Sequence, residues 1–79
     1  TIPLLWKDML IGRGFRADMI IDRQVLVEFK SVEYLLPVHK KQVLTYLKIT
    51  GLRLGLLLNF RTELMKDGIF RLVNSLEAE

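Results

Sequence analysis

Two short segments of alternating polarity stand close together in the first half of the chain. In residues 15–21 and again in residues 25–30, apolar side chains occupy alternate positions. A period of two residues is typical of β-strands with one face toward a core. The polar residues Asp22 to Gln24 between them are of the kind that forms turns. The sequence therefore predicts two antiparallel strands joined by a three-residue loop.

Glycine and proline mark the ends of the neighbouring elements. An apolar segment at residues 4–11 is followed by Gly12-Arg13-Gly14, whose glycines can adopt the positive φ of a hairpin turn. This predicts a first strand that pairs with residues 15–21. Pro37 is tolerated in the first helical turn and Gly51 is a typical helix end, which predicts a helix over residues 37–50.

A nearly continuous apolar run follows the predicted helix at residues 52–60. Such a run is typical of a strand that is buried on both faces and reached by a helical crossover. Residues 62–68 are expected to form a loop or one helical turn, and residues 69–73 a short edge strand. We therefore expect an α/β (α+β) fold: a mixed sheet of three antiparallel strands, a crossover helix and further strands.

Length and composition limit what this fold can be. The 79 residues provide one small domain, and 51% hydrophobic against 27% charged residues favours a packed chain over a disordered one. The absence of cysteine and the single histidine exclude a disulfide framework and a cysteine-type zinc site. Any metal ion would be held mainly by oxygen atoms.

The overall charge is mildly basic. A net charge of +3 is compatible with a polyanionic partner but also common in ordinary soluble proteins. No apolar run approaches the about 18 residues of a membrane span, and no secretory leader pattern is visible at the start. We expect a chain that acts in the cytoplasm without a membrane partner.

The predicted three-residue loop has a consequence for two acidic residues. If Ile21 faces Val25, then Asp18 lies directly opposite Glu28. Two like charges about 5 Å apart repel by about 3 kcal/mol at an effective dielectric constant near 20. A divalent cation, a shared proton or the cations Arg16 and Lys30 could offset this repulsion. The alternative is a ladder of salt bridges on a solvated face.

The predicted helix carries two polar residues on its core-facing side. A helical projection places Gln42 and Tyr46 near the centre of a stripe that runs from Val38 to Ile49 and leaves Leu44 outside. A buried amide or phenol needs a hydrogen-bond partner, and we expect the carboxylates to supply it. Alternatively, Tyr46 is a core aromatic residue with its hydroxyl at the rim, and Gln42 bonds a loop backbone. His39 is expected to be a first-turn residue rather than a ligand.

The order of these residues resembles a known superfamily. The PD-(D/E)XK nuclease superfamily has an acid on one strand and an acid-x-Lys motif on the next, which Asp18 and Glu28-Phe29-Lys30 resemble. Its RecB-like branch has a Gln-x-x-x-Tyr motif on a helix, which Gln42 to Tyr46 resembles. Four stretches are similar to the GxxExxY family of that superfamily: residues 14–18 (GFRAD), 27–33 (VEFKSVE), 42–47 (QVLTYL) and 55–60 (GLLLNF). The resemblance implies a restriction-endonuclease-like fold and a single domain over residues 1–79.

The resemblance also implies a metal-dependent nuclease that hydrolyses the phosphodiester bonds of nucleic acid. We expect DNA rather than RNA as its substrate. Asp18, Glu28 and the backbone carbonyl of Phe29 would hold Mg²⁺ or Mn²⁺. Lys30 would orient the attacking water or neutralise charge on the phosphate, and Gln42 and Tyr46 would position metal-site groups or a nucleotide. Three basic residues are candidates for phosphate contacts: Arg16, Lys40 and Lys41.

The sequence departs from the family in one respect. The GxxExxY segment, on an N-terminal helix in the family, is not found before the first predicted hairpin. We expect a domain without that helix, in which one sheet face (Met19, Ile21, Val25, Val27 and Phe29) lies exposed unless a second copy or a missing segment covers it. Two alternatives to a nuclease remain: an inactive nucleic-acid-binding module and a structural interaction subunit.

Overall fold

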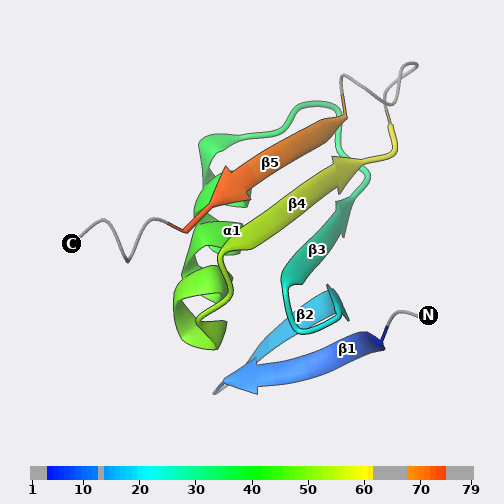
Figure 1. Ribbon diagram of the computed structural model, residues 1–79. Helices are drawn as coiled ribbons and strands as arrows, with labels where there is room; N and C mark the ends of the chain where they lie inside the picture. The colour runs from blue at the N-terminus through cyan, green and yellow to red at the C-terminus, as the bar shows by residue number, and fades with distance from the viewer. Residues whose placement is uncertain (1–3, 13, 62–67, 75–79) are drawn as a thin grey trace.

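The computed structural model describes residues 4–12, 14–61 and 68–74 and shows one mixed sheet with one helix (Figure 1). The sheet order is β1-β2-β3-β4-β5; β3 and β4 are parallel and the other neighbours are antiparallel. The elements are β1 (Leu5–Gly12), β2 (Phe15–Ile21), β3 (Val25–Lys30), α1 (Pro37–Thr50), β4 (Leu54–Asn59) and β5 (Ile69–Val73). The predicted α+β fold is confirmed; predictions for Arg13 and residues 62–67 lie outside the described residues.

The turn between β2 and β3 sets the register of the two strands. Asp22 and Arg23 both adopt positive φ, at 52° and 57°, and the N–H of Gln24 donates to the carbonyl of Ile21 at 2.9 Å. Two successive residues of this kind give the turn the twist that suits an antiparallel pair. Ile21 pairs with Val25, and the predicted register is therefore confirmed.

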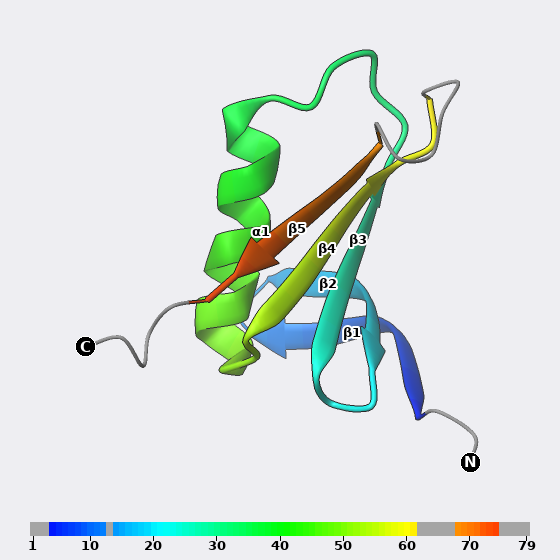
Figure 2. The same ribbon diagram turned by 45° about the horizontal axis from the view of Figure 1, so that its top comes forward.

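Helix α1 lies across one face of the sheet (Figure 2). The helix begins where the N–H of Leu36 donates to Nδ1 of His39 at 2.9 Å, so His39 is a first-turn residue as predicted. It ends at Gly51, whose left-handed backbone donates to the carbonyl of Leu47 at 2.8 Å. Pro37 lies at the first helical position and Gly51 at the C-terminal cap, so the proline and glycine signals located the helix correctly.

The core-facing side of α1 is rotated from the predicted stripe. The buried helix residues are Val43, Tyr46 and Leu47. Leu44 packs against the core, whereas Val38 and Ile49 are exposed. Close contact with β4 fixes this orientation, because a Cβ atom added at Gly55 would lie 2.7 Å from Cγ1 of Val43.

Strand β2 changes the side that it presents to the core. Ala17 and Ile20 are both buried in the core cluster, although a regular strand would place them on opposite faces. Opposite this point on β1, Asp8 adopts a positive φ of 49°, and its pairing with Asp18 is missing from the ladder, which also shifts register between Leu10 and Gly12. The predicted alternation through residues 15–21 is therefore interrupted at Asp18.

The other face of the sheet is largely apolar. In the described part of the chain no helix covers it, and its side chains are half-buried or exposed, apart from the buried Val27. The expectation that Val27 is exposed is wrong, because its register neighbours on both sides, Met19 on β2 and Leu56 on β4, enclose it. The face comprises Met19, Ile21, Val25, Phe29, Leu54, Leu56, Leu58, Ile69 and Val73, with Arg71 as a charged member.

Candidate metal centre and nuclease site

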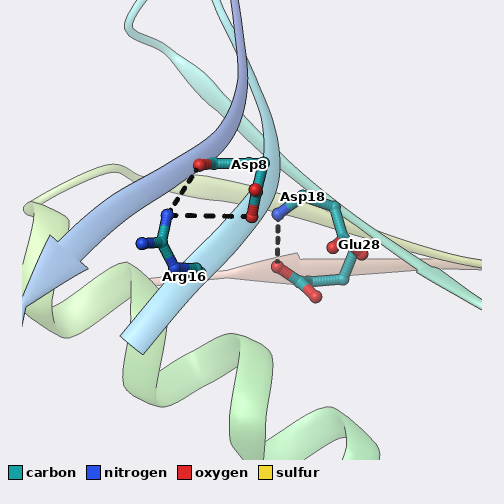
Figure 3. Close-up of polar contacts among 4 residues, drawn as sticks. All are labelled: Asp8, Arg16, Asp18 and Glu28. Atoms are coloured by element: carbon teal, nitrogen blue, oxygen red, sulfur yellow. Dashed lines mark hydrogen bonds and ion pairs between the residues drawn. The ribbon is translucent and has the colours of Figure 1, made fainter. Parts of the chain in front are cut away.

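Strands β2 and β3 stop pairing at the two predicted acidic residues. The ladder ends at Met19 and Val27, one step before Asp18 and Glu28. Side chains then replace the backbone bonds. The N–H of Asp18 donates to Oε1 of Glu28 at 3.0 Å (Figure 3), and the N–H of Phe29 donates to Oδ2 of Asp18 at 2.9 Å. The predicted juxtaposition of the two acids is present, and both carboxylates are held in the gap between the strands.

The environment of Glu28 favours its protonated form. The residue is 3% exposed, and its pKa is raised from 4.5 to about 7, chiefly because burial removes the carboxylate from water. The hydrogen bond from the Asp18 backbone lowers this pKa, whereas the neighbouring Asp18 carboxylate raises it, and the charge of Lys30 lowers it. Protonation of Glu28 below about pH 7 would relieve part of the repulsion.

The alternative of a solvated salt-bridge ladder is wrong. Arg16 instead turns to β1, where its Nη1 lies 3.9 Å from Oδ1 of Asp8 and donates to the Asp8 carbonyl at 3.2 Å (Figure 3). Among the residues that the structure describes, neither Asp18 nor Glu28 forms an ion pair with Arg16 or Lys30. Glu28 is also too deeply buried to belong to a solvated face.

The donor set of this gap fits a hard divalent cation. The carbonyl of Lys30 points toward β4, where it accepts the N–H of Phe60 at 2.9 Å. Because successive carbonyls of a strand point in opposite directions, the Phe29 carbonyl points toward β2 and the carboxylates. Two carboxylates and one carbonyl suit Mg²⁺, which keeps several water molecules. Within the described ranges, no cluster of three or more acidic, histidine or cysteine side chains could hold a metal.

Lys30 is placed at the end of β3 by a clamp that sequence reasoning missed. Asn59 is 2% exposed; its Oδ1 accepts the N–H of Val32 at 3.0 Å, and its Nδ2 donates to the Val32 carbonyl at 2.8 Å. The amide thus continues the β3–β4 pairing beyond Lys30, which pairs with Asn59 in register. The signal in the sequence for this clamp was Asn59 itself, a polar residue near the end of the apolar run at residues 52–60.

Gln42 and Tyr46 bind each other. Nε2 of Gln42 donates to Oη of Tyr46 at 2.9 Å, as their spacing of four residues permits. In the described part of the chain neither side chain bonds to Asp18 or Glu28, so the expectation that the carboxylates supply their partner is wrong. The ring of Phe15 meets that of Tyr46 edge-on at 5.8 Å, and Tyr46 is a buried core aromatic residue.

The predicted phosphate-binding residues lie on different parts of the molecule. Nζ of Lys40 is 3.7 Å from the centre of the Phe70 ring on β5, at one edge of the sheet. Arg16 lies beside Asp8 on β1, at the opposite edge, and Lys41 is exposed on α1. The structure therefore does not gather these three cations around the two carboxylates.

Comparison with known proteins decides the family. The family model described as the PD-(D/E)XK nuclease superfamily matches residues 1–72. The chain belongs to the PD-(D/E)XK nuclease superfamily. Comparisons with curated proteins and with solved structures gave no significant match. The five-stranded mixed sheet with its helix is consistent with the restriction-endonuclease-like fold of PD-(D/E)XK proteins.

Membership of the PD-(D/E)XK superfamily indicates a nuclease-type function that involves nucleic acid. Divalent metals are typical of these nucleases, and the gap between β2 and β3 offers oxygen donors of the matching kind. The part of the chain that the structure describes contains no helix long and apolar enough to cross a membrane.

Proposed function

We propose that this chain is a Mg²⁺- or Mn²⁺-dependent nuclease that hydrolyses phosphodiester bonds of nucleic acid, DNA rather than RNA. The observation that carries the proposal is the reciprocal bonding of Asp18 and Glu28 across the gap where β2 and β3 separate. Lys30 lies two residues beyond Glu28 on the same strand face. This arrangement brings two acids together, with one basic residue on the same face of β3 as Glu28.

Asp18, Glu28 and the Phe29 carbonyl would hold the metal ion. When bound, the ion would polarise the phosphoryl oxygen and lower the pKa of a bound water molecule. The amino group of Lys30 would orient the attacking water or neutralise charge that develops on the phosphate. The Asn59 clamp supports this role, because it holds the backbone of Val32, two residues after Lys30.

Gln42 and Tyr46 would act as positioning residues. Their mutual hydrogen bond holds the two side chains together on α1, and the remaining amide atoms of Gln42 could bind a nucleotide. Arg16, Lys40 and Lys41 would contact phosphates distant from the scissile bond, since they lie apart from the carboxylates.

Three finer assignments belong to the same proposal. The four stretches that resemble GxxExxY proteins support membership of that RecB-like branch. The largely apolar outer face of the sheet supports a homo-oligomer or a covering segment, because exposed apolar faces of this extent mark interaction sites. A nuclease of this kind would act in the cytoplasm.

Hydrolysis of a labelled DNA strand with Mg²⁺ or Mn²⁺ tests the proposal. Asp18→Asn, Glu28→Gln and Lys30→Met should each lower the rate by at least about 100-fold, and Lys48→Met, an exposed lysine on α1, serves as the matched control. DNA binding without hydrolysis would contradict the proposal and support an inactive binding module. Neither binding nor hydrolysis would support a structural subunit.

A further inference from the structure

Strand β1 has an unusual backbone at Asp8. The φ of this residue is 49°, and among the strand residues that the structure describes Asp8 alone has a positive φ. Nη1 of Arg16 donates to the Asp8 carbonyl at 3.2 Å and lies 3.9 Å from Oδ1 of the same residue (Figure 3). Aspartate tolerates this left-handed backbone, whereas a β-branched residue rarely adopts it. The residue type therefore allows the conformation, and Arg16 bonds it in place.

Strands β1 and β2 change sides together at this step. Met9 pairs with Ala17, and both pack in or against the core, whereas Met19, two residues further along β2, lies on the outer face. Residues two apart in a regular strand share a face. The change of side therefore falls at Asp18, which the pairs on either side place directly opposite Asp8.

The same step is where β2 leaves β3. The ladder between these strands ends at Met19 and Val27. Beyond it, the N–H of Asp18 donates to the Glu28 carboxylate, and the N–H of Phe29 donates to the Asp18 carboxylate. A regular β2 would continue its backbone pairing past this point and leave no gap for the two acids.

The Asp8 carboxylate is not a further member of the metal centre. Its side chain is 82% exposed and lies beside Arg16. Over residues 4–12, 14–61 and 68–74, no three acidic, histidine or cysteine side chains come close enough to hold one metal ion. What Asp8 contributes is the conformation of its backbone.

We propose that Asp8 is a positioning residue for the proposed metal centre: its left-handed backbone turns β2 at Asp18, and this turn allows Asp18 and Glu28 to meet in the gap beside β3. Asp8 acts through Asp18 and touches neither metal nor substrate. The inference rests on the proposed nuclease function, because the carboxylates that Asp8 positions are the proposed metal ligands.

Three substitutions remove the Asp8 carboxylate and differ in the backbone that they allow. Asp8→Gly and Asp8→Asn keep access to a positive φ, whereas Asp8→Val disfavours it. Should Asp8→Val not fold, Asp8→Ala replaces it, because alanine also disfavours a positive φ but has no branch at Cβ. The matched control is Lys7→Val, at the exposed neighbouring residue of β1, whose φ is negative.

Hydrogen exchange in EDTA measures the positioning without metal. Relative to the amide of Leu47 on α1, the amides of Asp18 and Phe29 should exchange about 5-fold to about 30-fold faster in Asp8→Val than in Asp8→Asn. Asp8→Gly should exchange like Asp8→Asn, and Lys7→Val like the parent. Normalisation to Leu47 removes any change in global stability.

Calorimetric titration of Mn²⁺ supplies the functional readout. The affinity of Asp8→Val should fall by a similar factor relative to Asp8→Asn, because fewer molecules hold the two carboxylates in the binding arrangement. Asp8→Gly and Asp8→Asn should stay within about 3-fold of the parent, since each loses only one exposed, screened charge.

Equal normalised exchange in Asp8→Val and Asp8→Asn would overturn the inference, as would equal Mn²⁺ affinity in these two variants. Loss of Mn²⁺ binding in Asp8→Gly would overturn it too, because the carboxylate itself would then be a ligand. A parent that binds no Mn²⁺ would contradict the proposed metal centre, whereas the exchange comparison would still decide whether Asp8 positions Asp18.

Discussion

The N–H of Asp18 donates to Oε1 of Glu28 at 3.0 Å, and the N–H of Phe29, the residue after Glu28, donates to Oδ2 of Asp18 at 2.9 Å. Two acids are thereby joined through each other's backbone at the point where β2 and β3 separate. The fold tolerates the repulsion between the two carboxylates because each of them accepts a hydrogen bond from a backbone N–H that would otherwise have no partner in the sheet. The arrangement has measurable consequences with and without metal.

The metal-free protein should lose stability as the pH rises. The pKa of Glu28 is about 7 in the folded chain and 4.5 in the unfolded one. The folded state therefore binds the proton more tightly; its stabilising effect is complete below pH 4.5 and is lost as the pH rises through 7. This difference in pKa corresponds to about 3 kcal/mol.

Urea denaturation in EDTA at pH 5 and pH 8 measures this effect. Glu28→Gln cannot titrate but can still accept the N–H of Asp18, so its free energy of unfolding should lack the part of the pH dependence that belongs to Glu28. Parallel pH profiles for the parent and Glu28→Gln would show that Glu28 does not hold a proton in the folded protein.

Asp18→Asn should have opposite effects with and without metal. The amide oxygen can still accept the N–H of Phe29, while the repulsion on Glu28 disappears, so the metal-free variant should be more stable by about 1 kcal/mol at pH 8. Mn²⁺ should raise the thermal midpoint of the parent but not of the variant. A variant that Mn²⁺ stabilises as strongly as the parent would contradict the assignment of Asp18.

Asn59→Ala should weaken the end of β3. The substitution leaves the N–H and C=O of Val32 without their buried partner, which costs about 1–3 kcal/mol. Chemical denaturation would measure the loss, with Arg61→Ala on the same turn as the exposed control. If Asn59→Ala unfolds at the same denaturant concentration as the control, the clamp does not hold this segment.

Gly55→Ala should be destabilising by about 1–3 kcal/mol, because the new Cβ would lie 2.7 Å from Cγ1 of the buried Val43. In a Val43→Ala background, Gly55→Ala should cost less stability than it does in the parent, since the shorter side chain leaves room for the methyl group. Additive effects in the double-mutant cycle would show that the two residues do not meet.

Local signals were sufficient to predict most of the fold. Pro37 and Gly51 located the helix because each acts at a helix end through its own backbone chemistry. The three-residue turn determined the register of β2 and β3, and that register placed Asp18 opposite Glu28. These features depend on residues close together in the chain, so they could be predicted from the alternation of apolar and polar residues and from the turn residues.

Features that depend on tertiary packing could not be predicted. A positive φ at Asp8 accompanies the change of side along β2; Asp tolerates this conformation, but most Asp residues do not adopt it, so it could not be predicted. The buried side of α1 differs from the predicted stripe because the close contact between Val43 and Gly55 decides which side of the helix faces the sheet. The Gln42–Tyr46 bond satisfied both groups within the helix, so their burial did not require the carboxylates.

Calorimetric titration of Mn²⁺ into the parent, Glu28→Gln and the control Glu33→Gln tests the central claim most directly. Glu33 is an exposed acid in the segment between β3 and α1 and should be dispensable. The account predicts saturable binding at pH 8 in the parent and in Glu33→Gln, and no binding in Glu28→Gln of equal foldedness. No binding in the parent, or equal binding in Glu28→Gln, would contradict a metal centre between β2 and β3.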